Sequence, residues 1–381
     1  LISQPDLNFH NPDVQDAILD VMRFWLDRGL DGFRLDTVNY YFHDAELRSN
    51  PPLASLHGRP AVNPYDMQSH RYSKSQPENV AWLRRVRALM DQYPGVTSVG
   101  EVGDDERGLE LMKQYTSGSE LLHMCYSFDF LSPKFTANHF RSKLEEFFAG
   151  DEGGWPCWSF SNHDVMRHNS RWAPYSVSPT DLSRQSIGLI LTLKGTAGLY
   201  QGGELGLPET DILHEELTDP RGIRFWPEDK GRDGCRTPMP WNANLPHAGF
   251  TTGTPWLPVK HPSVVLSADQ QEQDPESTLN FYRKILAWRK TRPTLRTGDI
   301  AFFDTAEPIL AFTRSGDDGD LVCVFNLSAE ARRVTITGVE GSLEPVSNQA
   351  ELSGSDLVLG PNGFAILPAR PGSANVVHQG E

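Results

Sequence analysis

Hydrophobic residues between Asn11 and Leu30 recur at intervals of three and four positions, the spacing of an amphipathic helix. They are Val14, Ala17, Ile18, Val21, Met22, Trp25 and Leu26. Asn11 is a suitable N-cap, Pro12 suits the first helical position, and Gly29 ends the pattern. Residues 31–39 then form a short apolar run that finishes in polar groups, which predicts a buried strand after the helix.

The alternation of helix and strand continues along the chain. Helices are predicted over residues 77–92, 135–148 and 182–193, and strands over 97–102, 121–128, 157–161 and 197–200. Strands that alternate with helices and end in polar residues indicate a parallel sheet with a site at its carboxyl edge, as in a (β/α)8 TIM barrel. A doubly wound open sheet also fits, but no G-x-G-x-x-G follows a strand, so the barrel is favoured.

The pattern changes after Pro293 to alternating strands with short turns. These strands are predicted over residues 300–303, 309–313, 321–326, 333–337, 357–359 and 363–367. The chain is therefore predicted to be an α/β barrel domain over residues 1–295 followed by an all-β sandwich over 296–381. Residues 51–75 and 208–254 lack periodicity and are predicted to be long loops near the site.

Composition narrows the classes of partner. The 381 residues are 38% hydrophobic and 22% charged, as in a globular protein, and carry a formal net charge of -15. This charge argues against binding nucleic acid or an anionic membrane surface. The same charge favours a neutral or cationic substrate. No run of 18 apolar residues or export-signal pattern is present, so a cytoplasmic location is expected.

The cysteines do not indicate a metal or disulfide framework. Cys125, Cys157, Cys235 and Cys323 lie far apart without CxxC spacing, so four reduced thiols are expected. No acid-rich loop has the spacing of an EF-hand. Neither a metal nor another cofactor is expected.

Three predicted strands each carry an acid at or just beyond their carboxyl end. Asp36 lies in GFRLDTV, Glu101 in SVGEV and Asp164 in FSNHD. A single Asp after a strand more often caps a helix or braces a loop, but three acids at one sheet edge favour catalysis. Hydrolysis of a glycosidic bond needs one ionised and one protonated carboxyl, and in a retaining enzyme the pair lies about 5–5.5 Å apart.

The neighbours of these acids suit the two protonation states. Arg34 precedes Asp36 by two residues, so both side chains face one side of a strand, where the guanidinium would keep Asp36 ionised. A structural salt bridge is the alternative. Glu101 follows an apolar strand that would raise its pKa, although the acidic residues 104–106 could mark a solvated turn.

The tripeptide Asn162, His163 and Asp164 offers donors and acceptors suited to vicinal sugar hydroxyls. An Asx-turn with a satisfied histidine is an equally good interpretation of these three residues alone.

At these residues the chain resembles glycoside hydrolase family 13, the α-amylase superfamily. GFRLDTV, VGEV and FSNHD resemble its conserved regions II, III and IV, and QPDLN (residues 4–8) resembles a region typical of oligo-1,6-glucosidases and α-glucosidases. RDGCRTPMPW (residues 232–241) and LYQGGELGLPE (residues 199–209) also resemble that subgroup.

The resemblance implies a role for each matching residue. Asp36 would be the nucleophile, Glu101 the acid/base and Asp164 the stabiliser of the transition state. Arg34 and His163 would bind the sugar at the cleavage subsite. Arg232 would recognise the non-reducing-end glucose, with Arg236 as the second candidate.

Some family features are missing. The Asp-x-x-x-Asn-His of region I and the first three barrel strands have no counterpart, so strands four to eight are expected here, the N-terminal part is expected to precede Leu1, and the 381 residues alone are expected to be inactive. Gly202, Gly203 and Glu204 stand where relatives have Gly-Glu-Glu, and Phe9-His10 replaces a more usual aromatic-acid pair.

Thr37 comes directly after the nucleophile, at a position where the residue type goes with the kind of glycosidic bond that relatives prefer. Relatives with Thr or Ala here tend to prefer α-1,4 bonds, and those with Val prefer α-1,6 bonds. The resemblance therefore implies a retaining α-glucosidase that removes terminal α-1,4-linked glucose from short, neutral oligosaccharides. An α-glucosyltransferase or isomerase, an oligo-1,6-glucosidase, and a catalytically inert relative like the amino-acid transporter heavy chains remain the alternatives.

Overall fold

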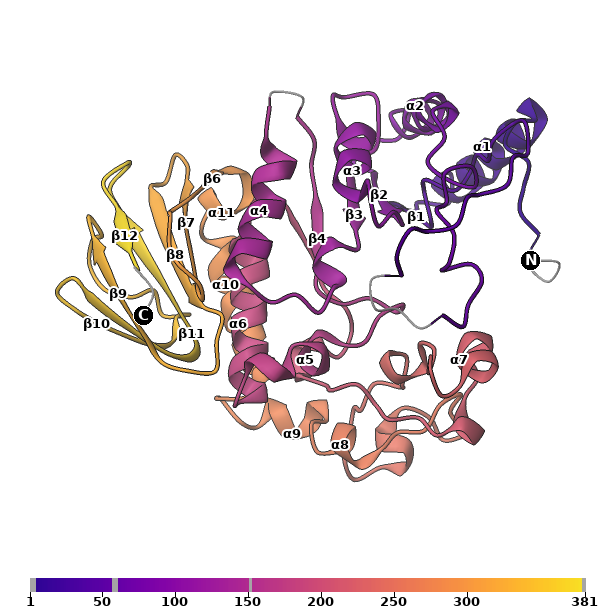
Figure 1. The fold of residues 1–381 in the computed structure, drawn as a ribbon. Coiled ribbons are helices and arrows are strands. Elements are labelled where there is room, and N and C mark those ends of the chain that lie inside the picture. The colour runs from indigo at the N-terminus through magenta and orange to yellow at the C-terminus, as the bar shows by residue number, and fades with distance from the viewer. Residues whose placement is uncertain (1–4, 57–60, 151–152, 379–381) are drawn as a thin grey trace. The chain divides into compact units, whose positions relative to one another are not determined.

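The computed structural model describes residues 5–56, 61–150 and 153–378 (Figure 1). It divides into two compact units, each of which is described by itself. The first comprises Leu1–Asp129 and Glu145–Trp158, and the second comprises Phe130–Leu144 and Ser159–Glu381. Gln4 of the QPDLN motif lies outside the described residues.

The first unit is built on a parallel three-stranded sheet. Its strands are β1 (Gly32–Leu35), β2 (Thr97–Val102) and β3 (Met124–Ser127), in the order β1-β2-β3. Its complete helices are α1 (Pro12–Leu26), α2 (Glu78–Met90) and α3 (Gly108–Thr116). The predicted helix-strand alternation and the parallel pairing are confirmed for these strands, whereas α3 falls where no helix was predicted.

Glycine at position 100 allows the sheet of the first unit to pack closely. A Cβ at Gly100 would lie 2.8 Å from Leu122 Cδ1, 2.9 Å from Cys125 Sγ and 3.0 Å from Val38 Cγ1. Real Cβ atoms do not approach heavy atoms so closely, so a larger residue would push these side chains apart. Because Glu101 comes next in the chain, the same packing sets the position of that carboxylate.

The second unit contains most of the remaining helices. They are α5 (His168–Arg171), α6 (Pro179–Thr192), α7 (Pro220–Phe225), α8 (His261–Val264), α9 (Ala268–Glu272), α10 (Thr278–Lys290) and α11 (Thr294–Thr297), while α4 (Ala137–Phe148) and β4 (Cys157–Ser159) cross the unit boundary. The end of β4 and β5 (Thr196–Gly198) form a two-stranded sheet. Three of the five predicted strands therefore form one sheet and two form another, and a single parallel bridge joins Cys125 of β3 to Pro156, the residue before β4. Closure of the strands into one barrel stays a prediction.

Short 3-10 helices lie in the connections. They are η1 (Asp129–Leu131), η2 (Ala173–Tyr175), η3 (Gly203–Leu205), η4 (His214–Glu216), η5 (Asp233–Cys235) and η6 (Pro246–Gly249). Apart from these and α7, residues 208–254 form no regular element. The described part of 51–75 has no helix or strand, and a single bridge joins Pro52 to Gln68. Both predicted long loops are therefore present.

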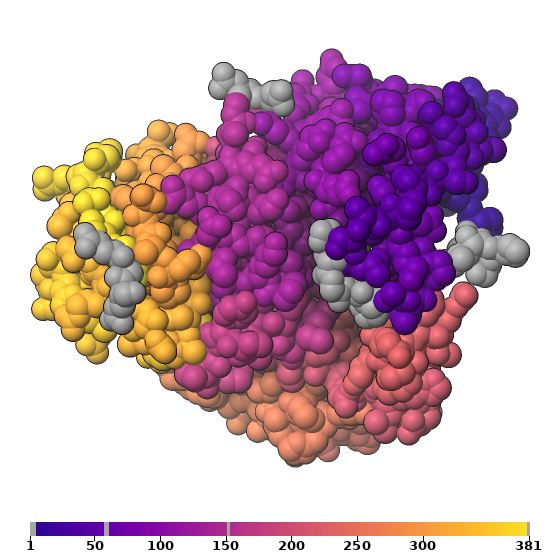
Figure 2. Space-filling view, viewed as in Figure 1, coloured from indigo at the N-terminus to yellow at the C-terminus, as the bar shows by residue number. Residues whose placement is uncertain are grey.

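The C-terminal strands form one antiparallel sheet, coloured orange to yellow in Figures 1 and 2. They are β6 (Asp299–Phe302), β7 (Ile309–Ser315), β8 (Asp320–Asn326), β9 (Arg332–Thr337), β10 (Asn348–Ser353), β11 (Asp356–Ala369) and β12 (Asn375–Val377). An all-β C-terminal region is confirmed, and its strands are joined in one hydrogen-bonded sheet. The sandwich arrangement stays a prediction.

Strand β11 (Asp356–Ala369) differs from its prediction. Residues 357–359 and 363–367 were predicted to be separate strands, and Gly360 and Pro361 between them usually interrupt a strand. The strand instead continues and changes partners: its first part pairs with β9 and β10, and residues from Phe364 onward pair with β8. A single long strand therefore joins the two halves around a shared core that includes Val322, Val334, Leu357 and Leu367.

Arg314 on β7 ties the sheet to the helices of the second unit. Its side chain is fully buried and donates to six backbone carbonyls, those of Thr192, Leu193, Thr294, Leu295, Gly298 and Asp299. Burial lowers its pKa to about 10, so the guanidinium stays charged at neutral pH. One side chain thus satisfies carbonyls at the ends of α6 and α11 and at the start of β6.

We expect Arg314→Leu to lower the free energy of unfolding by about 3 kcal/mol or more, because buried carbonyls would lose their donors. Urea unfolding of both proteins measures this difference. Arg333→Leu is the control, since Arg333 lies exposed on β9. Equal stability of the two variants would show that the buried contacts of Arg314 add nothing.

Candidate active site

Arg34, Asp36, Glu101 and Tyr126 come together in the first unit. Arg34 lies on β1, and Asp36 follows directly after that strand. Glu101 and Tyr126 are register partners on β2 and β3. The parallel sheet therefore places a cation, two acids and a phenol on neighbouring strands.

The Arg34 guanidinium is shared by both acids. It forms an ion pair with Asp36 Oδ1, and its Nη2 lies 2.7 Å from Glu101 Oε2. Nη2 also donates to Tyr126 Oη at 2.8 Å. The expected contact between Arg34 and Asp36 is present, but Arg34 also contacts the second acid, which the strand pattern did not indicate.

The two carboxylates lie in different surroundings. The side chain of Asp36 is 70% exposed, whereas that of Glu101 is 3% exposed. Burial raises the pKa of Glu101, although the hydrogen bond from Tyr126 Oη at 2.7 Å and the charge of Arg34 oppose the rise. The predicted direction of the pKa change at Glu101 is confirmed. One acid is open to solvent beside a cation, and the other is held towards its protonated form.

Thr37 connects Asp36 to Glu101 through the backbone. Its N–H donates to Glu101 Oε2 at 3.3 Å, and the N–H of Val38 donates to the Glu101 carbonyl at 2.8 Å. Thr37 has a φ of 41°, an unfavourable value for a β-branched residue. Such strain persists only where the surroundings impose it and is common at functional sites.

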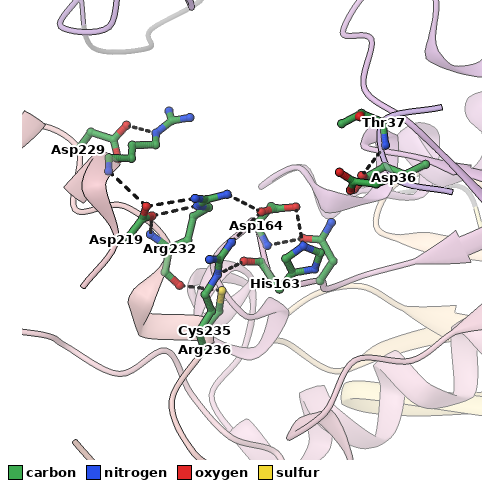
Figure 3. Close-up of polar contacts among 12 residues, drawn as sticks. Asp36, Thr37, His163, Asp164, Asp219, Asp229, Arg232, Cys235 and Arg236 are labelled. Carbon is green, nitrogen blue, oxygen red and sulfur yellow. Dashed lines mark hydrogen bonds and ion pairs between the residues drawn. The ribbon is translucent and has the colours of Figure 1, made fainter. Parts of the chain in front are cut away.

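A second cluster surrounds Asp164 in the second unit (Figure 3). Asp164 Oδ1 lies 3.0 Å from Arg232 Nη1 and 2.9 Å from Arg236 Nη2, and Oδ2 lies 3.3 Å from His163 Nε2. The Asp164 N–H donates to Asn162 Oδ1 at 2.9 Å, as in the predicted Asx-turn. The turn and a cluster of charged hydrogen-bonding groups therefore occur together.

Asp219 fixes the guanidinium of Arg232. Its carboxylate accepts from Arg232 Nε at 2.9 Å, Nη2 at 3.1 Å and the backbone N–H at 2.9 Å. The side chain is 1% exposed. Although burial opposes it, hydrogen bonding to Arg232 lowers the pKa of Asp219 to about 2. Arg232 is therefore held by one carboxylate while it presents Nη1 to another.

The sequence-predicted site residues fall into two groups. Arg34, Asp36, Thr37 and Glu101 lie in the first unit, and His163, Asp164, Arg232 and Arg236 lie in the second. The structure brings the members of each group together. That all three acids act on one substrate stays a prediction.

Sequence reasoning missed Tyr126 and Asp219. Tyr126 belongs to the apolar run of β3, so its hydroxyl was hidden among core residues. Asp219 begins the Asp-Pro pair that starts α7, a recognisable N-cap signal, and it does accept from the Arg221 N–H. Nothing in that pattern indicated that the same carboxylate also binds Arg232.

The structure also bears on the state of the cysteines, on metal binding and on membrane-spanning helices. Cys125, Cys157, Cys235 and Cys323 are all free and buried, so the prediction of unpaired thiols is confirmed. Over residues 5–56, 61–150 and 153–378, no group of three or more His, Cys, Asp or Glu is arranged to hold a metal ion. No helix in the same ranges combines the length and apolar character needed to cross a membrane.

Comparison with known proteins gives a consistent match. The sequence profile described as "Alpha amylase, catalytic domain" matches residues 1–298. A probable alpha-glucosidase of Rhizobium meliloti (strain 1021) is 50% identical over 336 residues, which cover 87% of this chain and 61% of that protein. Maltase A1 of Drosophila melanogaster is 31% identical, with 88% and 60% covered.

Solved structures show the same similarity. The alpha-glucosyl transfer enzyme XgtA has a TM-score of 0.91 at 44% identity, over 97% of this chain and 70% of that one. The trehalulose synthase MutB from Pseudomonas mesoacidophila MX-45 has a TM-score of 0.81 at 25% identity, with 96% and 70% covered. The chain spans 60–61% of the length of the two curated relatives above.

We expect Asp219→Asn to destabilise the protein by about 2 kcal/mol at pH 7, because a pKa lowered from 3.8 to about 2 corresponds to roughly that energy. A depressed acid pKa stabilises the fold fully above about pH 4, and this contribution is lost as the pH falls towards 2. Urea unfolding of wild type and variant over this range measures the difference.

The exposed residue Asp317 supplies the control variant for this measurement, Asp317→Asn. A stability difference between Asp219→Asn and wild type that stayed constant from pH 7 to pH 3 would contradict the ion-pair explanation.

Proposed function

Because the chain belongs to the α-amylase family, we propose that the whole protein is a retaining α-glucosidase that acts on short, neutral oligosaccharides. The observation that carries this proposal is the arrangement around Arg34, where an exposed acid and a buried acid share one guanidinium. Paired carboxyls whose surroundings favour opposite protonation states are what retaining hydrolysis requires.

In the proposed reaction Asp36 attacks the anomeric carbon while Glu101 donates its proton to the departing glycosidic oxygen. The C–O bond to the leaving sugar breaks as the glucosyl–Asp36 ester forms. Glu101, now ionised, then takes a proton from water, which attacks the ester and releases glucose and free Asp36. Arg34 contacts both acids, so its positive charge lies beside Asp36 at the start and beside Glu101 after that residue has given up its proton.

Asp164 and its neighbours are proposed to bind the sugar. A carboxylate fixed in place by two arginines can stabilise positive charge on the sugar ring in the transition state. His163 and Arg232 offer donors to sugar hydroxyls beside it. The bond that Asp219 makes with Arg232 supports this role, because it fixes the direction of the donors.

Glucosyl transfer is the second candidate. The similarity to the alpha-glucosyl transfer enzyme XgtA favours it, since hydrolysis and transfer share the covalent intermediate and differ in the acceptor. Analysis of products formed at high sugar concentration distinguishes the two: mostly free glucose supports hydrolysis, and mostly new oligosaccharides supports transfer.

We expect Asp36→Asn to lower kcat for maltose by at least about 1,000-fold, because the amide cannot form the ester. Circular dichroism should show the fold unchanged, since Asp36 is exposed. Asp13→Asn, on exposed α1, is the matched control with normal activity. Activity that survives in Asp36→Asn would indicate a different nucleophile, whereas an unaltered whole protein without activity would favour the catalytically inert family members.

We expect Tyr126→Phe to raise the pKa of Glu101, since its ionised form would lose a donor. The alkaline limb of the profile of kcat/KM against pH should therefore move to higher pH. Tyr93→Phe is the control, because the Tyr93 hydroxyl bonds instead to Asp27. A shift to lower pH, or none, would argue against Glu101 as the acid.

Turnover of maltose is expected to exceed that of isomaltose, and Thr37→Val should shift the ratio of their kcat/KM values towards isomaltose by about tenfold. Val is β-branched like Thr, so the strain at φ 41° is retained and the hydroxyl is replaced by a methyl group. Preference of the unaltered protein for isomaltose would instead indicate an oligo-1,6-glucosidase.

A further inference from the structure

A small hollow lies in the second unit beside η3, where side chains from several elements converge. Its lining includes Ser161, His168, Ser186, Tyr200, Gly203 and Tyr282. The cavity volume open to the centre of a water-sized sphere is about 20 Å³. A cavity needs about 10–15 Å³ by this measure to hold one water molecule, so there is room for one and little more.

His168 places an unpaired polar atom at this hollow. The residue is 7% exposed, and its Nδ1 lies 2.9 Å from Ser161 Oγ. Ser161 Oγ also accepts from the His168 backbone N–H at 2.9 Å. Among the described residues, Nε2 of the same ring has no hydrogen-bond partner. A buried polar atom left in this way is costly unless something else satisfies it.

Ser186 contributes a second such atom. It lies on α6, is 1% exposed, and its Oγ also has no partner within the described part of the chain. The neighbouring side chain of Tyr282, on α10, is buried as well. Two separate elements therefore each contribute a lining residue with an unsatisfied polar atom to the same hollow, so their occurrence together needs an explanation.

Gly203 keeps the hollow open. A Cβ at this position would lie 3.5 Å from Tyr282 Oη and 3.6 Å from His168 Cε1, which is ordinary van der Waals contact. The backbone of Gly203 does not have the positive φ that would require glycine. An alanine therefore fits without strain but would occupy the space between these two rings.

The charge state of His168 limits what the hollow can bind. Burial, with the nearby charges of Arg171 and Arg167, lowers the pKa of His168 to about 3, so the ring is neutral at pH 7. If Ser161 Oγ donates to Nδ1, Nε2 carries the proton and needs an acceptor. If Nδ1 donates, Nε2 needs a donor. A water molecule satisfies either tautomer, whereas an anion satisfies only one.

We propose that this hollow is a binding site for one ordered water molecule, which hydrogen-bonds His168 Nε2 and Ser186 Oγ. Such a water joins α5 to α6 at the point where the chain leaves the segment that carries His163 and Asp164. Buried waters with two or more polar partners are integral parts of a fold. Here the water braces the segment that presents Asp164.

Gly203→Ala and Ser186→Ala test the proposal through the sign of their effects on stability. Where no water is bound, filling the hollow or deleting an unpaired hydroxyl stabilises the protein, and both variants raise Tm. With a bound water, Gly203→Ala displaces it and Ser186→Ala removes one of its partners. Both variants should then lower Tm, by about 1–3 °C.

Gly253→Ala is the matched control for the backbone effect of replacing glycine. Its backbone also lacks a positive φ, and the nearest atom to an added Cβ among the described residues is Thr251 Oγ1 at 3.7 Å. A rise in Tm for Gly203→Ala equal to that of the control would overturn the proposal.

A crystal structure of the whole protein gives a second measurement that does not depend on stability. A density peak of water size within hydrogen-bond distance of His168 Nε2 and Ser186 Oγ, absent from Gly203→Ala, is expected. An empty hollow, or a stronger peak that appears only when chloride or formate is added, would contradict the assignment to water.

Discussion

The proposed chemistry depends on one guanidinium, that of Arg34, which contacts Asp36, Glu101 and Tyr126 from the first strand of a parallel sheet. Two carboxylates held so close repel one another unless a cation lies between them. Arg34 removes that repulsion, while the difference in burial keeps the acids unequal. The fold serves this contact: the register of β1, β2 and β3 brings the residues together, and Gly100 lets the strands pack closely enough.

The second unit also positions its charged side chains through pairs of arginine and carboxylate, but in another arrangement. There the carboxylate of Asp164 forms ion pairs with two arginines, and the buried Asp219 forms an ion pair with one of them, Arg232. Chains of alternating charge of this kind fix side-chain directions more firmly than single pairs, because each member has its hydrogen bonds satisfied. Positioning therefore comes from residues that need not touch a substrate.

The sequence predicted those features that are set by residues close together in the chain, such as helix caps and side chains on one strand. Helix α1 begins at Pro12, directly after its predicted N-cap Asn11. Arg34 and Asp36 are in contact because they are two residues apart in the chain, at the end of β1. Contacts set by tertiary pairing were not predictable in this way. Tyr126 reaches Glu101 only through the register of two strands, and β11 continues past Pro361 because it exchanges one partner strand for another. The Gly-Pro-Asn-Gly sequence is typical of a break between strands. Whether the strand continues through it depends on the neighbouring strands with which it pairs.

The most direct test of the central claim is to trap the covalent intermediate in a Glu101→Gln variant of the whole protein. With a glucoside whose leaving group needs no acid, the ester should form but hydrolyse slowly, because the base that activates water is gone. Mass spectrometry of peptides from the quenched reaction should then find a glucosyl group on Asp36. A glucosyl group on another carboxylate, or none during measurable turnover, would contradict the assignment of Asp36 as the nucleophile.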